Sequence, residues 1–134
     1  MKKRKTKKNY RAYKYYNDTY GFTTHLFVGT YKACDKWLRR KFNYVGDEDN
    51  TADYGGLSWV LVQDDGRTSD SFIWLPNFKG TVDDYVTLSH ECLHIAYESL
   101  YRRGVRIHNS DTEQLNYLQD ALYRAFLLKL KKGK

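Results

Sequence analysis

Two histidines and a glutamate, in the run His90-Glu91-Cys92-Leu93-His94, are the residues of this sequence best suited to chemistry. On an α-helix, residues four apart lie about 40° apart around the axis and one turn along it, so both imidazoles point to the same side. Two imidazoles in that position can bind one metal ion, and Glu91, about 100° round from His90, flanks it. A carboxylate there can take a proton from a water activated by the ion. The spacing therefore predicts a zinc site with Glu91 as general base.

The motif requires a helix, and the surrounding sequence predicts one. Thr81 is a suitable N-cap, and Asp83 and Asp84 follow in the first turn, where carboxylates interact favourably with the helix dipole. Arg102 and Arg103 followed by Gly104 are typical of a helix end. We therefore expect a helix from about residue 82 to about residue 103, with the motif near its middle.

A catalytic zinc site needs a third protein ligand, with a fourth position left open. The downstream candidates are His108, Asp111 and Glu113, and each has an ordinary structural alternative. His108 fits a loop histidine, and Asp111 fits the start of a helix. Glu113 lies three residues after Ser110, which is the spacing of a capping box. The residues alone do not choose among these three.

The motif is followed after 18 residues by the start of an amphipathic helix, Glu113-Gln-Leu-Asn-Tyr117-Leu. This combination resembles the small zincin-type metallopeptidases. The resemblance is closest to compact phage-encoded metallopeptidases and looser to the ImmA/IrrE family. It covers roughly residues 82–122 and implies that Glu113 is the third zinc ligand. It also implies a minimal zincin-like domain.

The sequence departs from two other zincin groups. Metzincins carry a glycine and a third histidine after the motif, but positions 97 and 100 are Tyr97 and Leu100. SprT-like proteases place a third histidine at a spacing near that of His108, so His108 is the second choice for the third ligand.

We therefore expect a zinc-dependent metallopeptidase, a hydrolase that cuts a peptide or protein substrate. Glu91 would take the proton of the attacking water and pass it to the leaving amine. A tyrosine hydroxyl is expected to stabilise the transition state, from Tyr117 or from Tyr97 or Tyr101. The alternative hypothesis is a non-catalytic zinc-containing module that binds nucleic acid or a protein partner through a basic N-terminal arm.

The net charge of +7 is concentrated at the N-terminus, because residues 1–14 hold eight of the 23 Lys and Arg and no acid. Residues 15–134 carry fifteen basic and sixteen acidic residues and form the predicted single domain. Residues 2–14 are either a solvated arm or a weak, non-specific contact with nucleic acid. Alternation through Tyr13, Tyr15 and Asn17 indicates an extended segment laid on the core.

Cys34 and Cys92 both fall on predicted helices, which favours reduced thiols and a cytoplasmic location, the host cytoplasm if the chain is phage-encoded. No apolar run is long enough to span a membrane. The sequence makes no prediction about the oligomeric state.

The remaining pattern predicts an α+β fold, a short antiparallel sheet packed against about three helices. The metal site is expected between the motif helix and the C-terminal helix. Pro76 suits an edge strand or a strand terminus, and a peptide can add to an edge strand beside the metal helix. His25 is interpreted as an ordinary half-exposed strand residue. The other predicted elements are a strand at 23–29, a helix at 31–42, a buried strand at 57–63 paired with a strand at 70–75, and a helix at 111–131.

Overall fold

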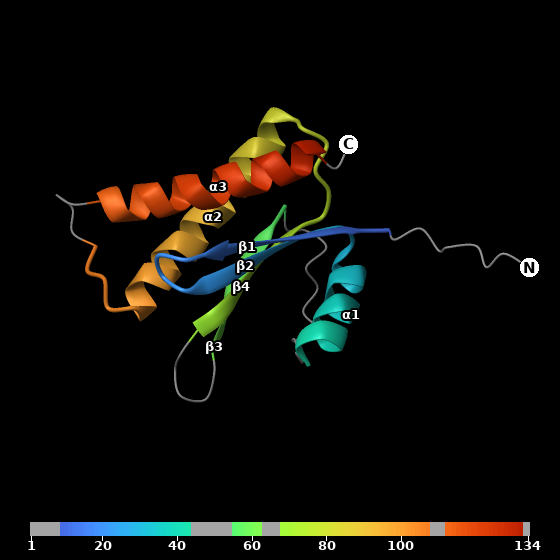
Figure 1. Ribbon diagram of the computed structural model, residues 1–134. Helices are drawn as coiled ribbons and strands as arrows, with labels where there is room; N and C mark the ends of the chain where they lie inside the picture. Colours follow the sequence, from blue (N-terminus) through green and yellow to red (C-terminus); the bar gives the residue numbers. More distant parts are fainter. Residues whose placement is uncertain (1–8, 44–54, 63–67, 108–111, 133–134) are drawn as a thin grey trace, which may run out of the picture.

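A computed structural model describes residues 9–43, 55–62, 68–107 and 112–132, and these ranges form an α+β fold (Figure 1). Its elements confirm the predicted class. In chain order they are β1 (Arg11–Asn17), β2 (Phe22–Val28), α1 (Tyr31–Phe42), β3 (Leu57–Val62), β4 (Thr68–Leu75), α2 (Val82–Arg102) and α3 (Glu113–Lys132).

The four strands form one mixed sheet in the order β1-β2-β4-β3. β1 and β3 pair antiparallel with their neighbours, as expected for a hairpin of β3 with β4, but β2 and β4 run parallel. The prediction of a purely antiparallel sheet was therefore wrong. Parallel pairing is possible because α1 and β3 lie between β2 and β4 in the chain and supply the crossover.

The predicted roles of the two hairpin strands are reversed. β4 lies inside the sheet and is buried from Ser71 to Leu75, whereas β3 is the edge strand and its described side chains are half-buried. Pro76 directly follows β4, so it marks the end of a strand rather than an edge. The edge strand beside the motif helix is thus β3.

The first strand begins within the segment that the charge pattern assigned to the basic arm. Residues 11–14 belong to β1, and Lys14 is paired with His25 of β2. Tyr13 and Tyr15 pack against the core on one side of this strand, which confirms the expected extended segment. The sheet therefore begins earlier than the charge boundary at residue 14.

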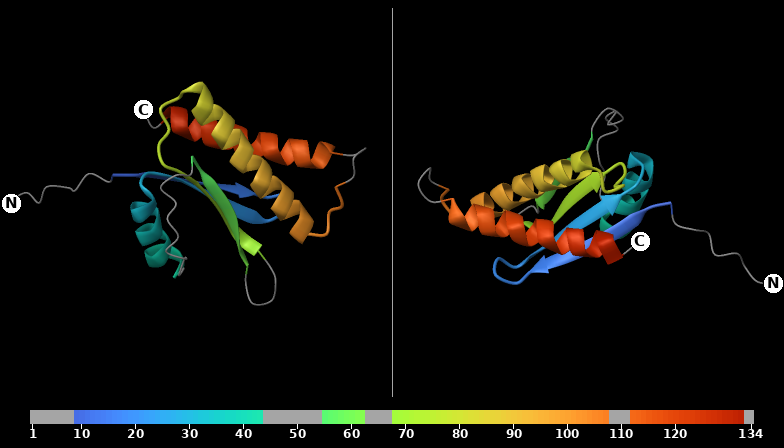
Figure 2. Two further views of the ribbon diagram at one scale, coloured as in Figure 1. Left: turned by 180° about the vertical axis from the view of Figure 1, so that it is seen from behind. Right: turned by 90° about the horizontal axis from the view of Figure 1, so that it is seen from above.

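Helices cover both faces of the sheet, and each face has its own core (Figures 1 and 2). α2 and α3 cover one face, where Leu26, Ile73 and Leu88 are among the buried residues. α1 covers part of the opposite face, where Phe27, Trp37 and Phe72 are buried. None of the helices in the described ranges has the length and apolar character needed to cross a bilayer. The motif on α2 and the surface beside α1 consequently lie on different faces of one sheet.

Candidate metal centre

The motif helix begins at the N-cap Thr81, as the sequence predicted, and Asp84 completes a capping box there. The Thr81 hydroxyl accepts a hydrogen bond from the Asp84 amide at 3.2 Å, and the Asp84 carboxylate accepts from the Thr81 amide at 3.1 Å. The Lys79 amide donates to the same carboxylate at 2.8 Å. Burial opposes ionisation of Asp84, but these hydrogen bonds outweigh it and lower its pKa.

The far end of α2 is tied to the sheet. The Arg103 guanidinium donates to the Tyr20 carbonyl at 2.8 Å and lies 4.7 Å from the centre of the Phe22 ring. Gly104, with φ of +75°, turns the chain away from the helix. Both ends of the motif helix are therefore held, which fixes the direction of its side chains.

His90 and His94 lie together on the solvent side of α2. Their Nε2 atoms are 3.0 Å apart and their ring centres 4.6 Å apart. Two nitrogen ligands of one tetrahedral zinc, each about 2.0–2.1 Å from the ion, would be about 3.3 Å apart. The separation in the structure is close to that value, but it is that of a hydrogen bond between the two Nε2 atoms, so the imidazoles can hold one zinc ion once both nitrogens turn toward a common point.

Glu91 points from the same helix toward the sheet. It is buried, with 7% of its surface exposed, and it lines a cleft of 480 Å³ between α2 and β3. The cleft is also lined by His94, Glu98 and Arg102 of α2. The residues from β3 are Leu57, Ser58, Trp59 and Val60. The cleft thus brings the predicted base and one predicted metal ligand to the edge strand.

Gly56 allows β3 to approach α2 closely enough to form this cleft. A Cβ atom at Gly56 would lie 3.0 Å from Cγ2 of Thr87 and 3.3 Å from the Trp74 carbonyl oxygen. A larger residue would require Thr87, Leu75 or the strand itself to shift by a few tenths of an ångström. Gly56 therefore has a defined packing role beside the cleft.

The third ligand is not assembled within the part of the chain that the structure describes. No group of three His, Cys, Asp or Glu side chains there could hold a metal ion. Glu113 is exposed as the first residue of α3. His108 and Asp111 lie outside the described residues.

Helix geometry explains why Glu113 stays apart. α3 contacts α2 through Gln119, whose amide donates to the Ser89 carbonyl at 3.1 Å. His90 and His94 lie about 100° and 140° round α2 from Ser89. The histidines therefore face the β3 side and solvent, whereas the predicted site lay between α2 and α3.

The three tyrosines considered as transition-state stabilisers are all exposed. Tyr97 and Tyr101 stack on each other with ring centres 6.4 Å apart, and neither lines the cleft that holds Glu91. Tyr117 is 67% exposed on α3. Among the described residues, no hydrogen bond joins any of their hydroxyls to His90 or His94.

Sequence reasoning missed two residues of the cleft, Glu98 and Arg102. They follow His94 at intervals of four residues and form an ion pair of 3.3 Å between Arg102 Nε and Glu98 Oε2. That regular spacing places them on the same side of the helix as His94, so their position on α2 could have been predicted from the sequence. What the sequence lacked was the identity of the strand that faces this side.

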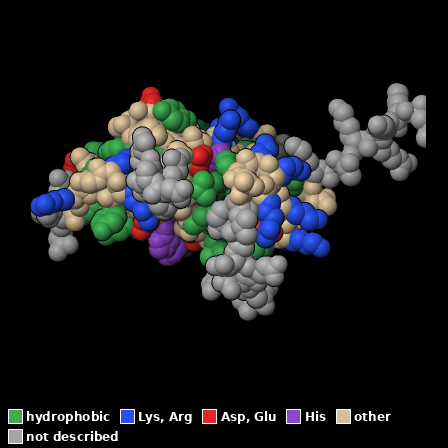
Figure 3. Space-filling view, turned by 90° about the horizontal axis from the view of Figure 1, so that it is seen from below, with side chains coloured by type: hydrophobic (Ala, Val, Ile, Leu, Met, Phe, Trp, Pro, Cys, Tyr) green, Lys and Arg blue, Asp and Glu red, His purple; other side chains and the backbone are tan. Residues whose placement is uncertain are grey.

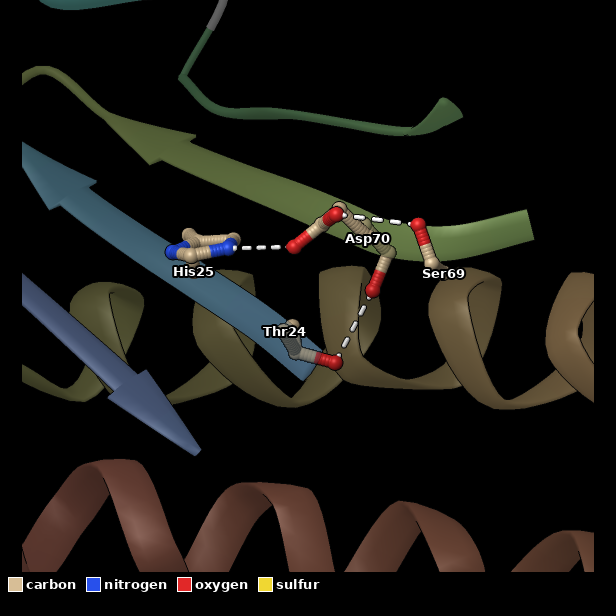
Figure 4. Close-up of polar contacts among 5 residues, drawn as sticks. Thr24, His25, Ser69 and Asp70 are labelled. Atoms are coloured by element: carbon tan, nitrogen blue, oxygen red, sulfur yellow. Dashed lines mark hydrogen bonds and ion pairs between the residues drawn. The ribbon is translucent and has the colours of Figure 1, made fainter. Parts of the chain in front are cut away.

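A second polar group was also missed, on β2 and β4 (Figure 4). His25 is 9% exposed, and its Nε2 is 2.8 Å from Oδ1 of Asp70, while the Ser69 hydroxyl donates to the same carboxylate at 3.1 Å. On the opposite face of the sheet, the hydroxyls of Thr24 and Ser71 are 2.9 Å apart. His25 is thus a buried, partnered histidine rather than the half-exposed residue that we predicted.

Comparisons of the chain with protein-family models, with curated protein sequences and with solved structures find no match.

Proposed function

We propose that the chain is a zinc-dependent metallopeptidase. The observation that carries this proposal is the pair of Nε2 atoms of His90 and His94, 3.0 Å apart, beside a buried Glu91 in a cleft along an edge strand. His90 and His94 are two ligands, and the third would come from His108, which lies outside the described residues, or from Glu113 after a movement of α3 toward α2. When bound, zinc polarises the scissile carbonyl and makes water acidic enough to react at neutral pH.

Glu91 acts as general base and then as general acid. Its position about 60° round the helix from His94 keeps the carboxylate beside the ion-binding imidazoles without adding it to the ligands. Burial between α2 and β3 restricts its motion and favours a single orientation toward the attacking water. It takes the proton of that water and passes it to the amine that leaves.

The substrate is an extended peptide added to the free side of β3. β3 pairs with β4 on one side, and no described strand pairs with its other side. Main-chain hydrogen bonds from β3 can hold a peptide in register. Because the cleft joins β3 to Glu91 and His94, a peptide in that register has a carbonyl close to the catalytic side chains.

The test is cleavage of an unstructured protein such as casein by the zinc-loaded chain and by Glu91→Gln. Zinc content is measured on the same samples. The proposal predicts that Glu91→Gln retains zinc and loses cleavage by at least about 100-fold, the usual contribution of a general base. The matched control Glu98→Gln changes a carboxylate in the same cleft and should retain cleavage. Equal cleavage by Glu91→Gln would refute the proposal.

A second function is a zinc-containing module without catalysis, which would bind nucleic acid or a protein partner through the N-terminal arm. It is favoured by the charge pattern, because residues 1–14 hold eight Lys and Arg and no acid. Retention of zinc by the wild type, with no cleavage of any peptide or protein substrate, would favour this module over the peptidase.

A further inference from the structure

A pocket of 430 Å³ lies on the sheet face opposite the motif helix, between β1, β2 and α1. Its polar and aromatic lining comes from three elements that are far apart in the sequence. These residues are Tyr13 and Lys14 of β1, His25 of β2, and Trp37, Lys41 and Phe42 of α1. The pocket therefore combines two ammonium groups with four rings, and it shares no residue with the cleft that holds Glu91.

The floor of this pocket is held rigidly by His25. Its imidazole stacks on Phe72 with ring centres 5.1 Å apart and meets the Phe42 ring edge-on at 4.9 Å. The bond to Asp70 fixes the orientation of the imidazole ring, as Figure 4 shows. A ring that enters the pocket thus meets preorganised aromatic groups, which lowers the entropic cost of binding.

The surface around the pocket is strongly basic. α1 carries five basic residues against the single acid Asp35, which is already paired with Arg39 at 2.9 Å. Within the described ranges, no carboxylate forms an ion pair with Lys14 or Lys41. Figure 3 shows Lys and Arg side chains gathered on the side of this face that carries α1. The local field therefore attracts anions.

The basic N-terminal segment joins the fold beside the same helix. Tyr10 stacks on Phe27 with ring centres 4.8 Å apart, and its hydroxyl accepts a hydrogen bond from Arg40 at 3.1 Å. In Figure 1 the N-terminal end of β1 lies at the same end of the sheet as α1. The charge of α1 and the described part of the basic segment, residues 9–14, are thus adjacent.

We propose that this face binds single-stranded nucleic acid, with one nucleotide seated in the pocket between Lys14, His25, Lys41 and Phe42. A pocket of this volume has the size of a small-molecule site and accommodates a nucleobase. The lysines contact phosphates, and Phe42, which is half-buried whereas His25 and Trp37 are buried, stacks on a base. Tyr16, two residues along β1 from Lys14 and 61% exposed, offers a second ring for a neighbouring base.

The aromatic lining is the reason for choosing a single strand. A duplex keeps its bases stacked inside, so it can use the charges of this surface but not the rings of the pocket. An acidic protein would likewise use the charges alone. Loss of affinity on removal of a ring is therefore the distinguishing property of a single-strand site.

The test is fluorescence anisotropy of a labelled 12-nucleotide oligothymidine with the full chain, over a range of salt concentrations. Each phosphate contact of a lysine contributes about 0.7 to the slope of log affinity against log salt for a single strand. Lys14→Gln with Lys41→Gln should therefore lower that slope by about 1.4. The control Lys131→Gln with Lys132→Gln removes the same charge from the end of α3 and should leave the slope unchanged.

Phe42→Leu tests stacking separately from charge. It should weaken oligothymidine binding about tenfold without changing the salt slope, because one base–aromatic contact is lost. Circular dichroism verifies that each variant folds. If Phe42→Leu does not fold, the variant Lys14→Gln with Lys41→Gln still tests the proposal. Equal salt slopes for the two lysine pairs would overturn the proposal. The proposal would also be overturned if the chain bound a duplex as tightly as oligothymidine and Phe42→Leu left oligothymidine binding unchanged.

This site does not depend on the peptidase. Glu91→Gln should bind oligothymidine as the wild type does, since Glu91 lies on the other face of the sheet. A chain that binds oligothymidine without cleaving any protein would support this inference and refute the proposed peptidase. Failure of the nucleic-acid site and failure of the peptidase therefore give different results.

Discussion

Replacement of Glu91 by glutamine shows, through its effect on stability, whether this carboxylate has a catalytic or a structural role. The Glu91 side chain is 7% exposed, and its carboxylate makes no hydrogen bond or ion pair within the described ranges. The oxygens of Glu91 are not among the buried polar atoms without a partner, so they reach the solvent of the cleft, where a neutral amide of the same shape meets the same surroundings. Glu91→Gln in the metal-free chain should therefore keep the free energy of unfolding within about 0.5 kcal/mol of the wild type.

A structural carboxylate would behave differently. If Glu91 stabilised the fold through hydrogen bonds, its replacement would leave buried donors without an acceptor and cost about 1–3 kcal/mol. Urea unfolding followed by far-ultraviolet circular dichroism measures the difference, with Glu98→Gln as the control for a partly exposed carboxylate of the same helix. A loss above about 2 kcal/mol for Glu91→Gln would refute the idea that burial of Glu91 serves catalysis.

Three further predictions concern the scaffold. The thiols of Cys34 and Cys92 should not react with a thiol reagent until the chain unfolds, because burial raises the pKa of Cys34 to about 12 and also raises that of Cys92; rapid native-state labelling would contradict this. Asp84→Ala should cost about 1 kcal/mol at pH 7 in urea unfolding through loss of the capping box. Because the folded-state pKa of Asp84 is lowered, its contribution is present above the ordinary value of 3.8 and fades as the pH falls below it; a cost unchanged at pH 2 would refute the assignment. Leu122→Ala, which empties a fully buried position of α3, should cost about 2–5 kcal/mol, and a cost below 1 kcal/mol would contradict the packing of α3 on this core.

The helices were predictable because their ends carry local signals. The caps Thr30 and Thr81 both accept hydrogen bonds from the third helical amide, and α1 has the predicted bounds. Such capping depends on a few neighbouring residues, so it can be recognised without knowledge of the rest of the chain. The direction of the His90 and His94 side chains followed from the same local geometry.

Strand order and the surroundings of the site depend on distant residues and were not predictable. β4 is an inner strand because β2, more than forty residues earlier, pairs with it in parallel. The same pairing brings His25 beside Asp70 and creates a buried polar pair that neither strand indicates by itself. Glu98 and Arg102 became recognisable as cleft residues only once β3 was identified as the strand facing α2.

Zinc binding by the wild type and by His94→Ala tests the central claim most directly. Metal content is measured after dialysis against excess zinc and then against buffer, with His25→Ala as a histidine control on the other face. The account predicts one zinc per wild-type chain, retention by His25→Ala, and loss by His94→Ala. Absence of zinc from the wild type, or equal zinc content in His94→Ala, would contradict it.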